Sequence, residues 1–66
     1  MRLTVNGETR EAPDKATLAD LLALLGIDGR RVAVERNREI APKSLWPQIV
    51  LAEGDQLEIV QFVGGG

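Results

Sequence analysis

The first residues of the chain alternate between apolar and polar, which is the pattern of a strand with one buried face. Leu3 and Val5 share one parity, and their neighbours are polar. The Asn-Gly pair at 6–7 is a strong short-range signal for a β-hairpin. The next segment, 8–12, is polar and runs into a proline, so it suits an exposed edge strand better than a central one.

A stripe of four leucines predicts one helix. Thr17 with Asp20 three residues later is a near match to the capping box, with Asp in place of the usual Glu. Gly26 stands where helices often end with a left-handed residue. We assign the stripe to the core rather than to a partner groove, because the chain would otherwise bury too little apolar area to offset its conformational entropy. The leucines, spaced i, i+3, i+4 and i+7, are Leu18, Leu21, Leu22 and Leu25.

The middle of the chain predicts a third strand and a short return. Val32 and Val34 alternate with less apolar neighbours, which indicates a strand with one buried face. Residues 36–38 form the turn that follows, and Ile40 begins the return.

Prolines interrupt the stretch after this return. We predict a single helical turn over 44–49 that buries Leu45 and Trp46. Trp46 is interpreted as a satellite core residue rather than as an aromatic that binds a partner. The Glu-Gly-Asp sequence at 53–55 predicts a turn, and residues 56–62 form the last strand.

This order of elements is hairpin, helix, strand, short return, helical turn and strand. One mixed sheet can then cover the leucine stripe on a single face. The predicted fold class is α+β, a β-grasp (ubiquitin-like) fold. Its mixed sheet of four to five strands packs on one main helix, with a short helical turn. The central place of the last strand is taken from the known pattern of this fold.

Apolar residues occur on both parities of the last strand. If Leu57 and Ile59 face the helix, Val60 and Phe62 face away from it. An open apolar patch on a monomer usually marks an interaction surface, so Val60 and Phe62 are candidate partner contacts. The alternative is a β-bulge near the strand end that turns Phe62 inward and removes the patch.

Composition limits the chemistry that the chain can perform. With 66 residues it forms one small domain, and with no Cys, His or Tyr it lacks a thiolate nucleophile, an imidazole and a Cys-based metal site. We therefore expect that the chain is not an enzyme and that it has no catalytic residues and no metal site. A net charge of −2 argues against a nucleic-acid partner. No apolar run approaches the roughly 20 residues of a membrane span, and no secretory signal is present, so we expect a cytoplasmic protein without a membrane partner.

The chain ends in three glycines, Gly64, Gly65 and Gly66, after a predicted domain at 1–63. An unstructured end or a cloning remnant would explain them without a function. The functional interpretation is a flexible tail whose Gly66 carboxylate reacts, because residues 63–66 extend about 13 Å when stretched and glycine threads narrow channels. Such a carboxylate must first be activated, for example by adenylation. The chain has no phosphate-binding loop, so ATP belongs to a partner and no cofactor is expected here.

The whole chain resembles the sulfur carrier proteins of thiamine thiazole biosynthesis, the ThiS family within the β-grasp superfamily that includes ubiquitin. One departure is Arg38, where the family usually has glycine after the asparagine of this turn. The resemblance is carried by Leu3-Thr4-Val5-Asn6-Gly7, Thr17-Leu18-x-x-Leu21-Leu22, Val32-Ala33-Val34-Glu35-x-Asn37, Ile40-x-Pro42-Lys43, Trp46, Gly54-Asp55, Leu57-Glu58-Ile59-Val60 and Val63-Gly64-Gly65-Gly66.

The resemblance implies a cycle of sulfur transfer. An adenylating partner similar to ubiquitin-activating enzymes uses ATP to convert the Gly66 carboxylate to an acyl adenylate. Sulfur from cysteine, mobilised by a desulfurase, then displaces AMP and leaves a thiocarboxylate, which supplies thiazole synthase. Gly65 and Gly66 carry over as the functional tail, with Gly64, Val63 and Phe62 as partner contacts.

Three other functions fit the same fold. The small subunit of molybdopterin synthase shares the fold and the diglycine end. A ubiquitin-like modifier would join Gly66 to lysines of target proteins. A plain β-grasp regulatory or RNA-binding module would tolerate loss of the tail.

Overall fold

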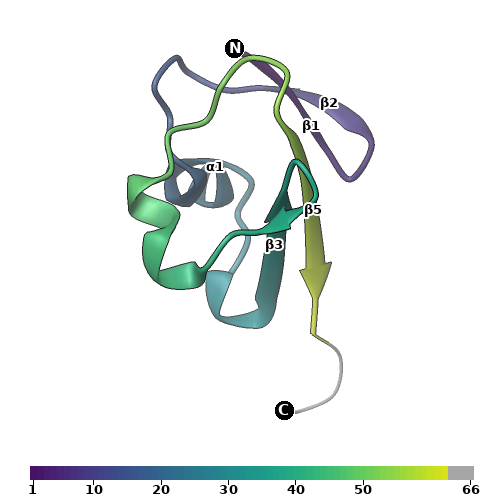
Figure 1. Ribbon diagram of the computed structural model, residues 1–66, viewed down its shortest axis with the longest axis vertical. Coiled ribbons are helices and arrows are strands. Elements are labelled where there is room, and N and C mark those ends of the chain that lie inside the picture. Colours follow the sequence, from purple (N-terminus) through teal and green to yellow (C-terminus); the bar gives the residue numbers. More distant parts are fainter. Residues whose placement is uncertain (63–66) are drawn as a thin grey trace.

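The structure is a computed structural model that describes residues 1–62, and within them five strands, one α-helix and two short 3₁₀ helices form (Figure 1). In chain order they are β1 (Arg2–Val5), β2 (Glu8–Glu11), α1 (Leu18–Leu24), η1 (Gly29–Arg31), β3 (Val32–Arg36), β4 (Glu39–Ile40), η2 (Lys43–Gln48) and β5 (Gln56–Gln61). The predicted boundary between a domain at 1–63 and a tail at 64–66 lies outside the described residues.

The sheet is mixed and has the strand order β2-β1-β5-β3-β4. β5 lies in the centre, parallel to β1 and antiparallel to β3. The other two pairs, β1 with β2 and β3 with β4, are antiparallel hairpins. This is the predicted β-grasp topology, in which the central place of the last strand was taken from the known pattern of the fold. β2 is an edge strand and all four of its residues are exposed, as its polar sequence predicts.

One face of the sheet packs on α1, and the opposite face, which we call the outer face, is turned away from the helix (Figure 1). The assignment of the leucine stripe to the core is confirmed, since three of its four leucines are buried and Leu25 is partly buried. The largest fully buried side chains are Leu3, Leu18, Leu21, Leu57 and Val34.

The predicted caps define both ends of α1. The Thr17 hydroxyl oxygen accepts a hydrogen bond from the Asp20 N–H at 3.1 Å, and the Asp20 carboxylate accepts one from the Thr17 N–H at 2.9 Å. At the other end Gly26 has φ +69°, and the Ile27 N–H donates to the Leu22 carbonyl at 3.0 Å. The helix is therefore only seven residues long.

Two tight turns close the hairpins, each with positive φ at both central residues. In the β1–β2 turn these are Asn6 (51°) and Gly7 (81°). In the β3–β4 turn they are Asn37 (51°) and Arg38 (72°), while Arg36, which we predicted in the turn, belongs to β3. Arg38 thus holds a left-handed conformation that a side chain with a Cβ adopts at a cost.

The helical turn before the last strand differs from the prediction in two ways. It runs over Lys43–Gln48, and it buries Trp46 but leaves Leu45 44% exposed. A 3₁₀ helix has about three residues per turn and presents one narrow face to the core, so neighbouring residues cannot both point inward. Trp46 occupies that face, and its indole N–H donates to the Ala41 carbonyl at 2.8 Å.

Candidate functional site

The outer face of the sheet carries the predicted apolar patch. Val60 and Phe62 are each 57% exposed, whereas Leu57 is 1% exposed and Ile59 is partly buried. The alternation that we predicted for the last strand is therefore confirmed, with Leu57 and Ile59 facing the helix.

The alternative of a β-bulge that turns Phe62 inward is wrong. Pairing between β3 and β5 is regular from Arg36 opposite Leu57 to Val32 opposite Gln61. The Phe62 N–H continues it by donating to the Arg31 carbonyl at 2.8 Å. With no extra residue in the ladder, Phe62 stays on the same face as Val60.

Ile40 adds a third exposed apolar side chain to this face. It lies opposite Glu35, which lies opposite Glu58 in the next strand, so all three share the face of Val60. Ile40 is 66% exposed. We call Ile40, Val60 and Phe62 the outer patch. We did not predict Ile40 as a contact, although a lone isoleucine in a polar two-residue strand was a signal.

Two carboxylates border the outer patch. Glu35 and Glu58 lie directly opposite each other in the β3–β5 ladder. Within residues 1–62 neither forms an ion pair with a basic side chain. Like charges at opposed positions destabilise a sheet, so this pair costs stability unless a partner brings basic groups to it. The outer patch therefore suits an apolar partner surface with basic residues at its border.

A buried carboxylate fixes the start of β5, the strand that leads to the tail. Asp55 is 6% exposed, and the Arg36 guanidinium, the Asn37 amide and the Ala52 N–H donate to it at 2.9, 3.0 and 2.8 Å. Burial raises the pKa of the Asp55 carboxyl, but these hydrogen bonds outweigh burial and hold its pKa below the ordinary value. From the sequence we predicted only a turn at these residues.

The predicted tail residues Val63, Gly64, Gly65 and Gly66 lie outside the described residues, so their roles stay predictions. Phe62 follows the central strand directly, which places the outer patch next to the point where the tail departs. Within residues 1–62 no three acidic side chains gather as a metal site. No helix in that part of the chain is long and apolar enough to cross a membrane.

The fold defines a β-grasp protein whose central strand ends beside an apolar patch and leads to a glycine tail. A sequence profile of the ThiS family matches residues 3–66. The sulfur carrier protein ThiS of Bacillus subtilis is 42% identical over 65 residues, which are 97% of this chain and 98% of that protein. A crystal structure of the thiamine biosynthesis protein ThiS from Geobacter metallireducens superposes with a TM-score of 0.86, 30% identity and full coverage of both chains.

Longer relatives contain a region like this chain. A thiazole synthase of Paramagnetospirillum magneticum is 53% identical over 66 residues, which are the whole of this chain but 20% of that protein. The chain therefore spans about a fifth of the length of such relatives.

The chain therefore belongs to the ThiS family.

Proposed function

We propose that the chain carries sulfur as a thiocarboxylate on Gly66 and donates it to thiazole synthase. A partner enzyme that binds ATP adenylates the Gly66 carboxylate, which releases pyrophosphate. A hydrosulfide equivalent derived from cysteine then attacks the acyl carbon and forms a C–S bond. The bond between the acyl carbon and the AMP oxygen breaks, AMP leaves with its electron pair, and one proton is released as the thiocarboxylate forms. The carrier needs no cofactor of its own, and the cycle runs in the cytoplasm, where ATP is available.

The composition of the chain suits this chemistry. A thiocarboxylate at the chain end replaces a cysteine side chain as the sulfur nucleophile, and the sequence contains no cysteine. Glycines at 64–66 carry no side chains, so they allow the backbone to enter an active site too narrow for other residues. Val60, Phe62 and Val63 would contact the partner that receives the tail.

The observation that carries the proposal is the position of the outer patch. Val60 and Phe62 are exposed at the C-terminal end of the central strand, directly before residues 63–66. A protein that grips this patch holds the tail at a fixed distance from its own active site. The likeness of this chain to a region of thiazole synthases supports thiazole synthase as that protein.

Intact-mass measurement after alkylation tests the chemistry. The chain is incubated with the adenylating enzyme, ATP and a cysteine desulfurase with cysteine, and then treated with a thiol-alkylating reagent. Because the chain has no cysteine, we expect one adduct, and we expect none when Gly66 is deleted or ATP is omitted. Failure to form the adduct with active partners would overturn the proposal.

The other candidate functions give different outcomes in the same system. A ubiquitin-like modifier would produce conjugates of higher mass that depend on Gly66. A molybdopterin synthase subunit would copurify with a large synthase subunit and act on a pterin precursor. The transfer of sulfur to thiazole synthase, followed by loss of the thioacid, distinguishes the proposed function from both.

A further inference from the structure

One edge of β5 is open near its C-terminal end. Alternate residues of β5 turn their backbone groups toward β1. There the Asp55 carbonyl accepts from the Thr4 N–H at 3.0 Å, and the Leu57 carbonyl accepts from the Asn6 N–H at 2.9 Å. β1 ends at Val5, and in Figure 1 β5 extends beyond the β1–β2 hairpin.

The Asn6 side chain extends this ladder by one step. Its amide oxygen accepts from the Ile59 N–H at 2.7 Å, and its amide nitrogen donates to the Ile59 carbonyl at 3.2 Å. Gln61 is the next residue of β5 that faces this side. Within residues 1–62, neither its N–H nor its carbonyl has a backbone or side-chain partner. An extended chain placed in line with β1 would pair with both.

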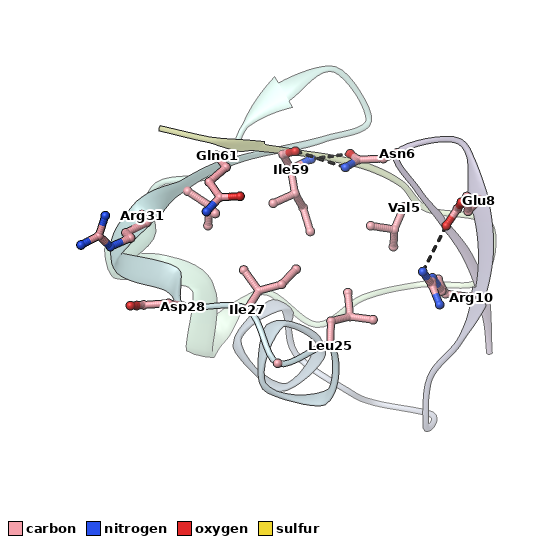
Figure 2. A pocket seen from close by; sticks show the side chains of 12 residues that line it. Val5, Asn6, Glu8, Arg10, Leu25, Ile27, Asp28, Arg31, Ile59 and Gln61 are labelled. Carbon is pink, nitrogen blue, oxygen red and sulfur yellow. Dashed lines mark hydrogen bonds and ion pairs between the residues drawn. The ribbon is translucent and has the colours of Figure 1, made fainter. Parts of the chain in front are cut away.

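A cavity of about 540 Å³ lies directly beneath this open edge, on the helix side of the sheet. Figure 2 shows Ile59 and Val5 pointing into it from the sheet, and Ile27 and Leu25 pointing into it from the segment after α1. The cavity exists because α1 ends at Leu24 and does not reach beneath the last residues of β5.

The open edge and the cavity fit a single occupant. Side chains of an added strand alternate between the two faces of the sheet. One would enter the cavity, and its neighbours would lie on the outer face beside Val60 and Phe62. The volume is ample for one large apolar side chain.

The charges at the cavity mouth indicate a second feature of the occupant. Arg10 pairs with Glu8 at 3.1 Å, and Asp28 pairs with Arg30 at 3.0 Å. Arg31, which also borders the cavity, forms no ion pair among the residues that the structure describes. A carboxylate on the incoming segment would complement Arg31.

We propose that thiazole synthase adds an extended segment to β5 at Gln61, with one large apolar side chain in the cavity and an acidic residue near Arg31. The identity of this partner rests on the proposed function. The edge interaction would hold the strand immediately before the tail on two sides at once, with β3 on one side and the partner on the other.

Replacing Gln61 by proline tests the backbone pairing. Gln61→Pro removes an N–H that no group in residues 1–62 uses, and proline is tolerated at a strand edge. The control Gln61→Ala keeps the N–H. Titration calorimetry with thiazole synthase from the same organism should show Kd raised about tenfold or more by Gln61→Pro and changed less than about threefold by Gln61→Ala. Equal binding by Gln61→Pro and the unmodified chain would overturn the proposal.

Two further measurements keep the test valid if Gln61→Pro unfolds the chain. Hydrogen exchange at the Gln61 amide of the unmodified chain should slow about 100-fold in the complex, since a paired strand amide is protected. Ile27→Phe should fill the cavity and weaken binding, whereas Ile27→Leu, of equal volume, should not. Unchanged exchange at Gln61 or full binding by Ile27→Phe would contradict the docking edge.

The remaining outcomes separate this inference from the proposed function. If the unmodified chain does not bind thiazole synthase, the proposed partner and this occupant both fail. If it binds and transfers sulfur but no variant alters binding, only the docking edge fails. A dimer of this chain that Gln61→Pro abolishes in sedimentation would assign the edge to a second copy and overturn the proposed occupant.

Discussion

The two ends of β5 differ in how completely their hydrogen-bonding groups are paired. At the start, strands pair on both sides of β5, and the buried Asp55 carboxylate accepts three hydrogen bonds. At the end, β3 alone pairs with the strand, and exposed apolar residues replace buried ones. We call the closed start of β5 the anchor. Changes at the anchor should alter stability, and changes at the open end should alter the proposed binding of a partner.

The largest effect on stability is expected at the anchor. Asp55→Ala leaves three donors without their acceptor, including the partly buried Arg36 guanidinium. We expect the free energy of unfolding to fall by about 3 kcal/mol. Urea denaturation measures this change. A loss within about 0.5 kcal/mol, the range of ordinary surface substitutions, would contradict the anchor.

Acid should weaken the same anchor. Because the pKa of Asp55 is lower in the folded chain than in the unfolded chain, its contribution to stability is complete above the unfolded value, about 3.9. That contribution is lost as the pH falls through the folded pKa. The difference in stability between the unmodified chain and Asp55→Asn should therefore shrink below pH ~4, as denaturation at a series of pH values would show. A difference that is constant over this range would contradict the assignment.

At the open end, Phe62→Ala should separate binding from folding. The ring is exposed, so we expect the free energy of unfolding to change by less than about 0.5 kcal/mol. Binding to thiazole synthase should weaken about 30-fold if the ring is a central contact of the interface. Calorimetry and thermal denaturation measure the two quantities. A large drop in melting temperature with unchanged binding would contradict the prediction, since it would show that Phe62 contributes to folding and not to the interface.

A substitution in the β3–β4 turn, beside the anchor, should raise the stability of the chain without weakening binding. Arg38 holds φ 72°, which glycine adopts without strain. Arg38→Gly should raise the free energy of unfolding by about 1 kcal/mol and leave partner binding unchanged. Asn37→Gly should instead destabilise the chain, because it removes the hydrogen bonds of the Asn37 side chain to the Asp55 carboxylate and from the Gln56 N–H. Destabilisation by Arg38→Gly would show that the arginine side chain contributes more than the strain costs.

The smallest effect is expected midway along β5. Glu58→Gln removes the repulsion from Glu35 and should stabilise the chain by about 0.5 kcal/mol. The same change should weaken binding and reduce its dependence on salt, since it removes one charge from the border of the outer patch. Denaturation and calorimetry at two salt concentrations measure both effects. Tighter binding by Glu58→Gln would exclude a basic partner surface at this position.

Local patterns predicted most of the fold. The Asn-Gly turn, the Thr17–Asp20 cap, the leucine stripe and the alternation around Val60 each depend on residues close together in sequence. The β-grasp order of strands followed from the sequence of elements together with the known pattern of that fold. The exposure of Val60 and Phe62 was predicted because it needs only strand parity.

Features that depend on distant residues were not predicted. The hydrogen bonds of Asp55 to Arg36 and Asn37 join residues that are 19 and 18 positions apart in the sequence. The hydrogen bond between the Asn6 side chain and the Ile59 N–H spans 53 positions. Ile40 joins the outer patch only through the register of two strands. Burial of Leu45 was predicted wrongly, because the pattern shows that residues 45 and 46 are apolar but not which of them a 3₁₀ turn directs inward.

The close approach of Gly29 to Trp46 has a practical consequence. A Cβ at position 29 would lie 2.8 Å from the indole ring, so the ring packs directly against the backbone of η1. Trp46 is the only tryptophan of the chain, and it lies on the helix side of the sheet, away from the outer patch. Its fluorescence is a built-in, label-free reporter that follows unfolding in every variant described above while remaining insensitive to contacts made on the opposite face.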